Sequence, residues 1–356
     1  MKLTRSTFPF AGSVATSEPI YKFTMSNEHG MEVDAITYGA TITDVRIPDA
    51  DGNVESVVMG FDTLDDYLLN PGLCLGCAVG RIAGRIDGAK FELDGTTYEV
   101  PANEGKNSLH GNKEFSSTPW AAEPFETDES CGIVFWYTSP DGLNGFPGEV
   151  TVKMTYVLDN TNTFYIRYEA VTDKKTVLNL TNHTYFNLNG NLKDTVENHL
   201  VKANVASYVE LREDCIPTGN LVPVEGTPFD FTSGKAIEEG THSDYPQNVM
   251  VKHGYDHPLV FDKATFAEDG YHQLQLSCPD AGRTLTIKTD YPCVVMYSGN
   301  YFDDSCTVRG VTGKPHLGVA LETQGYPDAM HHDNFEPVTL DVGETYDHIT
   351  SWHFDW

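Results

Sequence analysis

Short alternating runs separated by turn dipeptides recur along the sequence, and this pattern restricts the fold more than any other feature. Residues 90–93 and 96–100 alternate around Asp94-Gly95, which is the strongest short-range signal for a β-hairpin. A second hairpin is predicted from residues 150–158 and 163–172, and further strands are predicted at 32–38, 41–47, 284–289, 293–297, 316–324 and 338–342. The one useful helical window covers residues 62–69 and ends at Asn70-Pro71. The sequence therefore predicts an antiparallel all-β fold with few short helices.

The length of the chain sets the scale of that fold. The sequence has 356 residues and contains no linker of biased composition, no charge block and no repeat of fixed period. A chain of this size is too large for a seven-stranded sandwich and needs many more strands around its core. We therefore predict one domain, residues 1–356, built as a large antiparallel β-sandwich.

The charge balance limits the partners of the protein. Its 52 acidic and 23 basic residues give a formal net charge of −29. Such a surface repels phosphate backbones and anionic lipids, so we expect neither nucleic acid nor a membrane as a partner. The N-terminus lacks a continuous apolar signal region, and no apolar run approaches spanning length, which predicts a cytoplasmic protein.

The seven cysteines give no sign of a disulfide framework. Their number is odd and their spacing is irregular in a long chain. Cys74 and Cys77 form a C-x-x-C pair, but neither a second pair nor histidines at zinc spacing accompany it. His331 and His332 are adjacent and cannot easily bind one ion from the same strand. We therefore expect no metal site.

An unusually polar strand is predicted from Val177 to Leu188. One of its faces carries an almost entirely polar set: Val177, Asn179, Thr181, His183, Tyr185 and Asn187. If this face is buried, each amide and hydroxyl needs a partner, which a polyhydroxylated ligand would supply. The same alternation also fits a solvent-facing edge of an antiparallel sheet. Periodicity alone leaves both interpretations open.

A second informative strand is predicted from His316 to Gln324. Leu317, Val319 and Leu321 mark its core face, and Gly318, Ala320, Glu322 and Gln324 lie on the other face. A carboxylate beside glycine and alanine sits in a space cleared of bulky side chains, as a ligand pocket requires. An exposed face of small residues is the alternative.

Three further stretches carry candidate functional groups. Arg81 and Arg85 would share one face of a strand, either as surface ion pairs or with one guanidinium turned inward to bind oxygen ligands. His110 lies in a polar loop. Asp256 precedes His257, and because adjacent side chains on an extended segment point opposite ways, Asp256 suits a hydroxyl acceptor better than an Asp-His pair.

The sequence contains no phosphate loop, no nucleophile elbow and no dinucleotide fingerprint. What remains is a carboxylate and imidazoles of different intrinsic pKa. This combination suits a proton-in, proton-out reaction that needs no cofactor.

Taken together, these stretches closely resemble the aldose 1-epimerase, or galactose mutarotase, family. The resemblance rests on motifs that occur in family order from about residue 80 onward: Gly80-Arg-Ile-Ala-Gly-Arg-Ile86, Asn107-Ser-Leu-His-Gly111, Asn179-Leu-Thr-Asn-His-Thr-Tyr-Phe-Asn-Leu188, Asp256-His257 and Glu322-Thr-Gln-x-x-Pro-Asp-Ala329. It implies a galactose mutarotase-like supersandwich that interconverts the α and β anomers of free hexoses such as galactose and glucose. It also implies an isomerase of hexose metabolism, monomeric or homodimeric, without a cofactor.

The resemblance also implies roles for individual residues. Glu322 resembles the general base that removes the proton from the anomeric hydroxyl, and His183 the general acid that protonates the ring oxygen. The residues implied to hold the sugar are Arg85, in preference to Arg81, together with His110, Asp256 and Tyr185. Because Glu322 must be ionised while His183 is protonated, we expect a bell-shaped pH profile.

The sequence departs from the family pattern at four positions: Gly84, Asn112, Pro258 and Val295. These departures bear on sugar preference more than on reaction type. Two alternatives are a hexose-6-phosphate 1-epimerase, which would need further basic residues, and a sugar-binding β-sandwich without catalysis.

Overall fold

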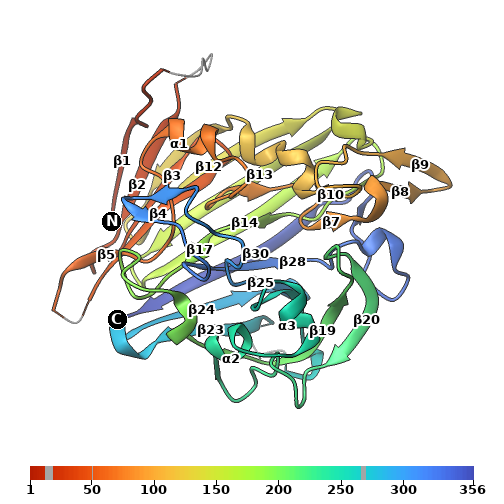
Figure 1. Cartoon of the computed structure of the whole chain (residues 1–356). Helices are drawn as coiled ribbons and strands as arrows, with labels where there is room; N and C mark the ends of the chain where they lie inside the picture. Colours follow the sequence, from red (N-terminus) through yellow and green to blue (C-terminus); the bar gives the residue numbers. More distant parts are fainter. Residues whose placement is uncertain (13–18, 50, 266–269) are drawn as a thin grey trace.

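A computed structural model describes residues 1–12, 19–49, 51–265 and 270–356 (Figure 1). Three antiparallel sheets of nine, six and five strands make up most of it. The nine-stranded sheet is the largest, and its strands lie in this order: β11 (Ala121–Glu126), β12 (Ser130–Ser139), β13 (Val150–Asp159), β14 (Thr163–Thr172), β30 (Tyr346–Asp355), β24 (Arg283–Thr289), β23 (His272–Cys278), β18 (Leu200–Ala203) and β21 (Lys235–Ala236).

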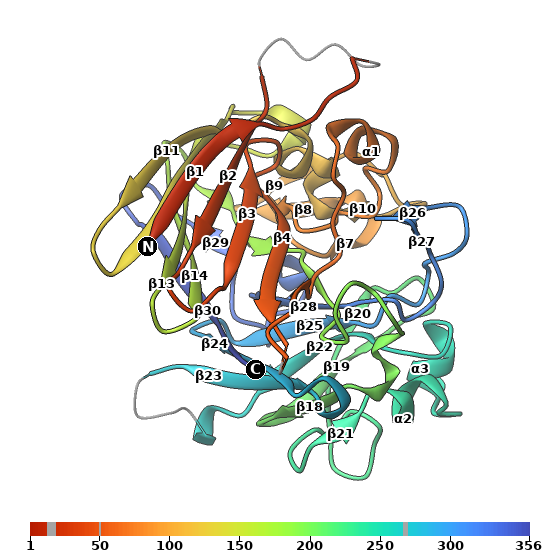
Figure 2. The same cartoon turned by 90° about the vertical axis from the view of Figure 1, so that its left-hand side faces the viewer.

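The six-stranded sheet carries the segments of greatest functional interest. Its order is β17 (Tyr185–Phe186), β28 (Val319–Gln324), β25 (Cys293–Tyr297), β22 (Asp256–Phe261), β19 (Val205–Leu211) and β20 (Pro217–Pro223). The five-stranded sheet is N-terminal, and its order is β1 (Lys2–Thr7), β2 (Tyr21–Ser26), β3 (Glu32–Ile36), β4 (Thr41–Pro48) and β5 (Val54–Ser56). Figure 2 shows β1 to β4 side by side.

Short two-stranded pairs and helices connect these sheets. The pairs are β8 (Lys90–Leu93) with β9 (Thr96–Glu99), β7 (Arg85–Ile86) with β10 (Ser108–Leu109), β6 (Ala78–Val79) with β16 (Thr181–Asn182), β15 (Thr176–Val177) with β29 (Thr339–Leu340), and β26 (Thr307–Val308) with β27 (Val311–Thr312). The α-helices of the described residues are α1 (Leu64–Leu69), α2 (Glu238–Thr241) and α3 (Pro246–Met250). None of the helices in these ranges combines the length and apolar composition needed to cross a bilayer.

The predicted all-β class and both predicted hairpins are confirmed. β13 alternates strictly between buried and partly exposed residues, as expected for a strand with one face on the core and one toward solvent. The main core contains apolar side chains of all three sheets, including Val33 of β3, Tyr156 of β13 and Val319 of β28. β28 differs because all six of its residues are buried. Something other than water must therefore cover its second face.

The prediction of one continuous strand from Val177 to Leu188 is wrong. The segment is broken into β15, β16 and β17, which pair with β29, β6 and β28 respectively. The alternation of side chains survives, but the backbone moves from one partner to the next. All twelve residues are buried, which excludes the interpretation as a solvent-facing edge.

Candidate active site

A pocket of about 590 Å³ opens beside β28 and β25, within the size range of ligand-binding sites. All six residues predicted to act on a substrate contribute to its lining: Arg85, His110, His183, Tyr185, Asp256 and Glu322. They come from segments that lie far apart in the sequence. The second face of β28 is thus a pocket wall.

The floor of the pocket is formed by neighbouring strands of the six-stranded sheet. Glu322 of β28 lies opposite Val295 of β25, which in turn lies opposite Pro258 of β22. Directly paired residues of an antiparallel sheet point to the same face, so these three side chains line one row of the pocket. Asp256 and Tyr297 form the next row. Glu322 therefore projects from a rigid, hydrogen-bonded support.

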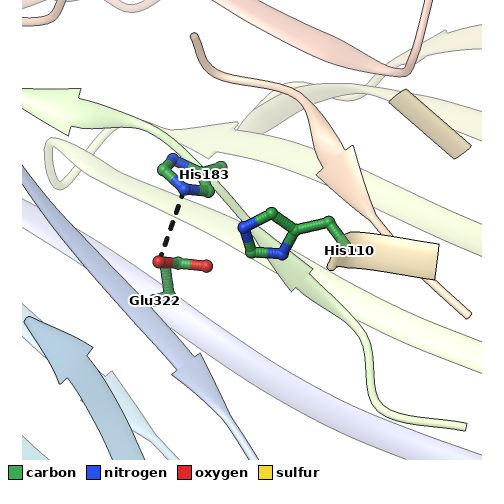
Figure 3. A group of neighbouring side chains, drawn as sticks. All are labelled: His110, His183 and Glu322. Carbon is green, nitrogen blue, oxygen red and sulfur yellow. Dashed lines mark ion pairs between the residues drawn. The ribbon is translucent and has the colours of Figure 1, made fainter. Parts of the chain in front are cut away.

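The side chains of His183 and Glu322 approach each other inside the pocket. Its Nε2 lies 3.5 Å from Oε1 of Glu322, and both side chains are buried (Figure 3). The backbone of His183 is fixed to a turn, because its N–H donates to the carbonyl of Cys77 and its carbonyl accepts from the N–H of Gly76, both at 2.9 Å. The ring packs between Tyr185 and His110, with centroids 4.9 and 5.3 Å away. The imidazole is thus oriented by packing rather than by hydrogen bonds to its Nδ1, which has no partner.

Burial shifts the titration of this pair in opposite directions. Removal from water raises the pKa of Glu322 to about 8, assisted by the negative charge of Asp256 and opposed by Arg85. Removal from water also lowers the pKa of His183. Both shifts favour the uncharged forms, so near neutral pH the pair holds one proton between its two members.

Arg85 enters the pocket from β7. β7 pairs with β10, which places Arg85 opposite Leu109, the residue before His110. Glu104 holds the guanidinium by two bonds, at 2.6 Å from Nε and 2.9 Å from Nη2. Nη1 lies 3.7 Å from Asp256, close enough for attraction but not for a direct hydrogen bond. Arg85 is therefore held in place while one edge stays directed at the pocket.

Arg81 has a different position from the one that its spacing suggested. The alternating pattern placed it on the same face as Arg85 and offered a surface ion pair as one role. Instead Arg81 is fully buried, and its guanidinium donates to the carbonyls of Ser139, Pro140 and Pro147 at 2.8–3.0 Å. The segment between the two arginines is not a regular strand, because it turns at Gly84 with a φ of 76°. The two side chains therefore diverge.

His110 presents a hydrogen-bond donor to the pocket. Its Nδ1 accepts from the backbone N–H of Gly84 at 3.2 Å, and burial holds the pKa of the ring well below its ordinary value. In the neutral imidazole the proton then resides on Nε2. The nitrogens of both histidines and the Glu322 carboxylate lie within 4.8 Å of one another, a spacing that could hold an ion. The tautomer of His110 makes its Nε2 a donor instead, so the set suits proton transfer better than metal binding.

Asp256 and His257 point to opposite sides of β22, as the sequence predicts. Asp256 lines the pocket, where burial raises its pKa to about 6. His257 is fully buried behind the strand and contacts Oε1 of Gln247 at 3.0 Å. The His257 Nδ1 accepts from the backbone N–H of Asp256 at 3.2 Å and does not meet its carboxylate, which leaves the carboxylate able to accept a hydrogen bond from a ligand.

Several residues of the pocket carried no sequence signal. Glu104 precedes the turn at Gly105-Lys106 in the polar loop, and only the tertiary structure pairs it with Arg85. Gln324 was placed on the same face as Glu322 but received no role. The remaining unassigned lining residues include Cys74, Lys106, Tyr297, Tyr301 and Phe302. All seven cysteines, Cys74 among them, are free thiols.

Comparisons with known proteins identify the family of the chain. The family model described as aldose 1-epimerase matches residues 21–353. The chain is 36% identical to galactose mutarotase of Rattus norvegicus over 342 residues, which cover 94% of each protein. It is 34% identical to aldose 1-epimerase of Haemophilus influenzae, over 89% of this chain and 90% of the relative.

A solved structure extends the similarity to the fold. The crystal structure of galactose 1-epimerase from Lactobacillus acidophilus superimposes with a TM-score of 0.86 at 28% identity, covering 99% of this chain and 98% of that protein. The similarity therefore covers all three sheets.

Proposed function

The chain belongs to the aldose 1-epimerase family, and we propose that Glu322 and His183 carry its reaction, the interconversion of the α and β anomers of a free aldose. We further propose galactose and glucose as substrates and residues 1–356 as one catalytic domain. The observation that supports these roles most directly is the 3.5 Å approach of His183 Nε2 to Glu322 Oε1 inside the pocket. A base and an acid side by side match the two oxygens of a hemiacetal carbon, its hydroxyl and the ring oxygen.

The reaction requires two proton transfers in each direction. The Glu322 carboxylate accepts the proton of the C1 hydroxyl while the His183 imidazolium donates a proton to O5. The C1–O5 bond breaks, and the open-chain aldehyde forms with a hydroxyl on C5. Rotation about C1–C2 exposes the other carbonyl face. In closure His183 recovers its proton from the C5 hydroxyl, and Glu322 returns its proton to the carbonyl oxygen.

The shared proton explains how one pocket can supply both partners. Burial favours protonated Glu322 with neutral His183, because it opposes charge on both groups. Moving that proton from Glu322 to His183 gives the ionic pair from which the reaction starts, with no change in total proton count. A sugar hydroxyl beside each group would replace some of the lost hydration and favour the ionic form.

The remaining pocket groups suit an uncharged, hydroxylated ligand. His110 offers an N–H, Arg85 offers guanidinium donors, and Asp256 offers acceptor oxygens. The cations near the rim already have acidic partners: Arg85 contacts Glu104, and Lys106 contacts Asp214. This pairing disfavours a phosphorylated sugar, which would need cations free to meet its negative charge.

Polarimetry of freshly dissolved α-galactose tests the proposal. We expect Glu322→Gln and His183→Asn each to lower the enzymatic rate by about 10²–10⁴-fold, because each removes one proton-transfer group. The matched substitutions Glu123→Gln and His253→Asn, at exposed positions, should leave the rate unchanged. A catalytic variant that retains nearly the wild-type rate above background would disprove the role of that residue. A wild-type protein that binds galactose without accelerating anomer exchange would disprove the activity itself.

A further inference from the structure

We infer that Gln324 is a further sugar-binding residue, whose amide holds a ring hydroxyl away from the anomeric carbon. This inference rests on the proposed function, since it concerns how the same pocket fixes its substrate. The sequence places Gln324 on the face of Glu322 and inside the motif that begins at Glu322, but assigns it no role.

The state of the Gln324 side chain is the first observation. The residue is 0% exposed, and both its Nε2 and its Oε1 lack a hydrogen-bond partner. Buried polar groups in folded proteins are almost always paired, so a fully unpaired buried amide requires an explanation. Elsewhere in the same pocket, His183 Nδ1 and Glu322 Oε2 are also unpaired. Gln324 therefore shares the property of the two groups assigned to chemistry.

The position of Gln324 is the second observation. It follows Glu322 by two residues on β28, so both side chains project from the same face, roughly 6.5 Å apart along the strand. This separation is comparable to the width of a pyranose ring with its hydroxyls. If Glu322 contacts the C1 hydroxyl, Gln324 lies beside a hydroxyl elsewhere on the ring.

Gly84 lies against the amide and also lines the pocket. A Cβ placed on Gly84 would lie 3.8 Å from Gln324 Nε2 and only 2.9 Å from a carbon of Pro327. A side chain at position 84 would therefore clash with Pro327 and crowd the amide. Gly84 also connects this region to His110, whose Nδ1 accepts its N–H. Amide, glycine and imidazole thus border one part of the pocket.

The other side chains of the pocket floor indicate which contact the Gln324 amide makes. Val295 and Pro258 offer no polar side-chain atoms, whereas Asp256 and Glu322 are carboxyl groups. A primary amide both donates through Nε2 and accepts through Oε1, which matches a hydroxyl that accepts and donates. It does so without adding charge beside Glu322. Gln324 therefore supplies a neutral, two-way contact to the sugar.

Substitution by methionine provides the test, because Gln324→Met keeps the length of the side chain and removes both polar atoms. We expect KM for galactose to rise about three- to tenfold, as for loss of one neutral hydrogen bond, with kcat changed less than twofold. The same substitution at exposed Gln273 is the control and should alter neither constant.

A series of deoxy sugars identifies the hydroxyl and separates binding from structural damage. With 2-, 3-, 4- and 6-deoxygalactose, we expect one sugar for which Gln324→Met and wild type have equal KM, because the partner hydroxyl is already missing. An unchanged KM for galactose, or an equal rise for galactose and all four deoxy sugars, would overturn the inference.

The thermal unfolding midpoint gives an independent readout. Since the amide has no partner in the protein, Gln324→Met should leave the midpoint unchanged or raise it. A drop of several degrees would reveal a structural role and overturn the inference. If the wild type lacks epimerase activity, the proposed function fails, while calorimetric binding of galactose to wild type and Gln324→Met still tests the contact.

Discussion

The two arginines of Gly80-Arg-Ile-Ala-Gly-Arg-Ile86 illustrate two kinds of buried polar group in this protein. Arg81 is fully enclosed, and its donors bind carbonyl oxygens and the hydroxyl of Ser139. Arg85 is held by Glu104 on one side and faces the pocket on the other. Their chemistry and sequence context are nearly the same. The two side chains differ in their hydrogen-bond partners inside the protein: those of Arg81 enclose its guanidinium, whereas those of Arg85 leave one edge facing the pocket.

The same contrast runs through the polar segment from Val177 to Leu188. Asn179 bonds both the N–H and the carbonyl of Gly325, and Asn187 donates to the carbonyls of Asp194 and Leu317. These amides replace the regular ladder where the segment changes strand partners. His183 lies on the same face but has an unpaired Nδ1, and its Nε2 lies beside Glu322. All of these residues are buried, and within this segment only His183 has a buried side-chain nitrogen or oxygen without a partner.

Substitution of each arginine by methionine is the most severe test of this contrast. We expect Arg81→Met to lower the free energy of unfolding by ~3–5 kcal/mol, because several buried carbonyls lose their donors. Arg85→Met should instead lower kcat/KM by about 10–100-fold through loss of a charged donor to the sugar. Urea unfolding and polarimetry on both variants separate the effects. Exchanged outcomes, with Arg85→Met the less stable and Arg81→Met the less active per folded molecule, would contradict the comparison.

The raised pKa of Glu322 should make the free energy of unfolding smaller at alkaline pH. Burial raises the pKa of Glu322 in the folded protein to about 8, above its ordinary value of 4.5. The folded state therefore binds this proton more tightly, and the associated stability is present below pH 4.5 and lost as the pH rises through 8.

Glu322→Gln cannot ionise and should escape this loss. We expect the variant to exceed the wild type by a few kcal/mol at pH 9, with the difference becoming small near pH 4.5. Chemical unfolding at both pH values measures the effect. A difference that stays constant across this range would show that Glu322 has an ordinary pKa.

Asn187 provides the corresponding test for the paired group. Asn187→Ala leaves the carbonyls of Asp194 and Leu317 without their donor, which we expect to lower the free energy of unfolding by ~1–3 kcal/mol. KM for galactose should remain unchanged, because Asn187 does not line the pocket. A raised KM at unchanged stability would assign Asn187 to the substrate site instead.

The smallest expected effect is a shift in the pH profile of kcat/KM. The rate should fall above about pH 8, where the Glu322–His183 pair loses its last proton. It should also fall at acidic pH, below the ordinary histidine pKa of 6.5, where the pair gains a second proton. Asp256 contributes to the raised pKa of Glu322, so Asp256→Asn should move the alkaline limb to lower pH. A limb that moves upward or stays fixed would show that this charge does not reach Glu322.

The sequence predicts the positions of strands and hairpins better than it predicts which strands pair with one another. The hairpins around Asp94-Gly95 and Asp159 to Asn162 were found because turn chemistry and alternation are local properties. The alternation from Val177 to Leu188 predicts one strand, which is wrong, because alternation indicates the direction of the side chains but not which strand pairs with the segment. The six site residues were named through motif resemblance, and their convergence in one pocket required the folded chain.

By itself the sequence determined the all-β class, the positions of most strands and the identity of the candidate acid and base. Local periodicity and turn residues are sufficient for the class and the strands, and motif resemblance identifies the candidate acid and base. Only the tertiary structure decided that Arg81 supports the fold while Arg85 faces the pocket, that Glu322 lies beside His183, and that Gln324 is left without a partner. These outcomes depend on long-range contacts and on exclusion of water, which no stretch of sequence specifies alone.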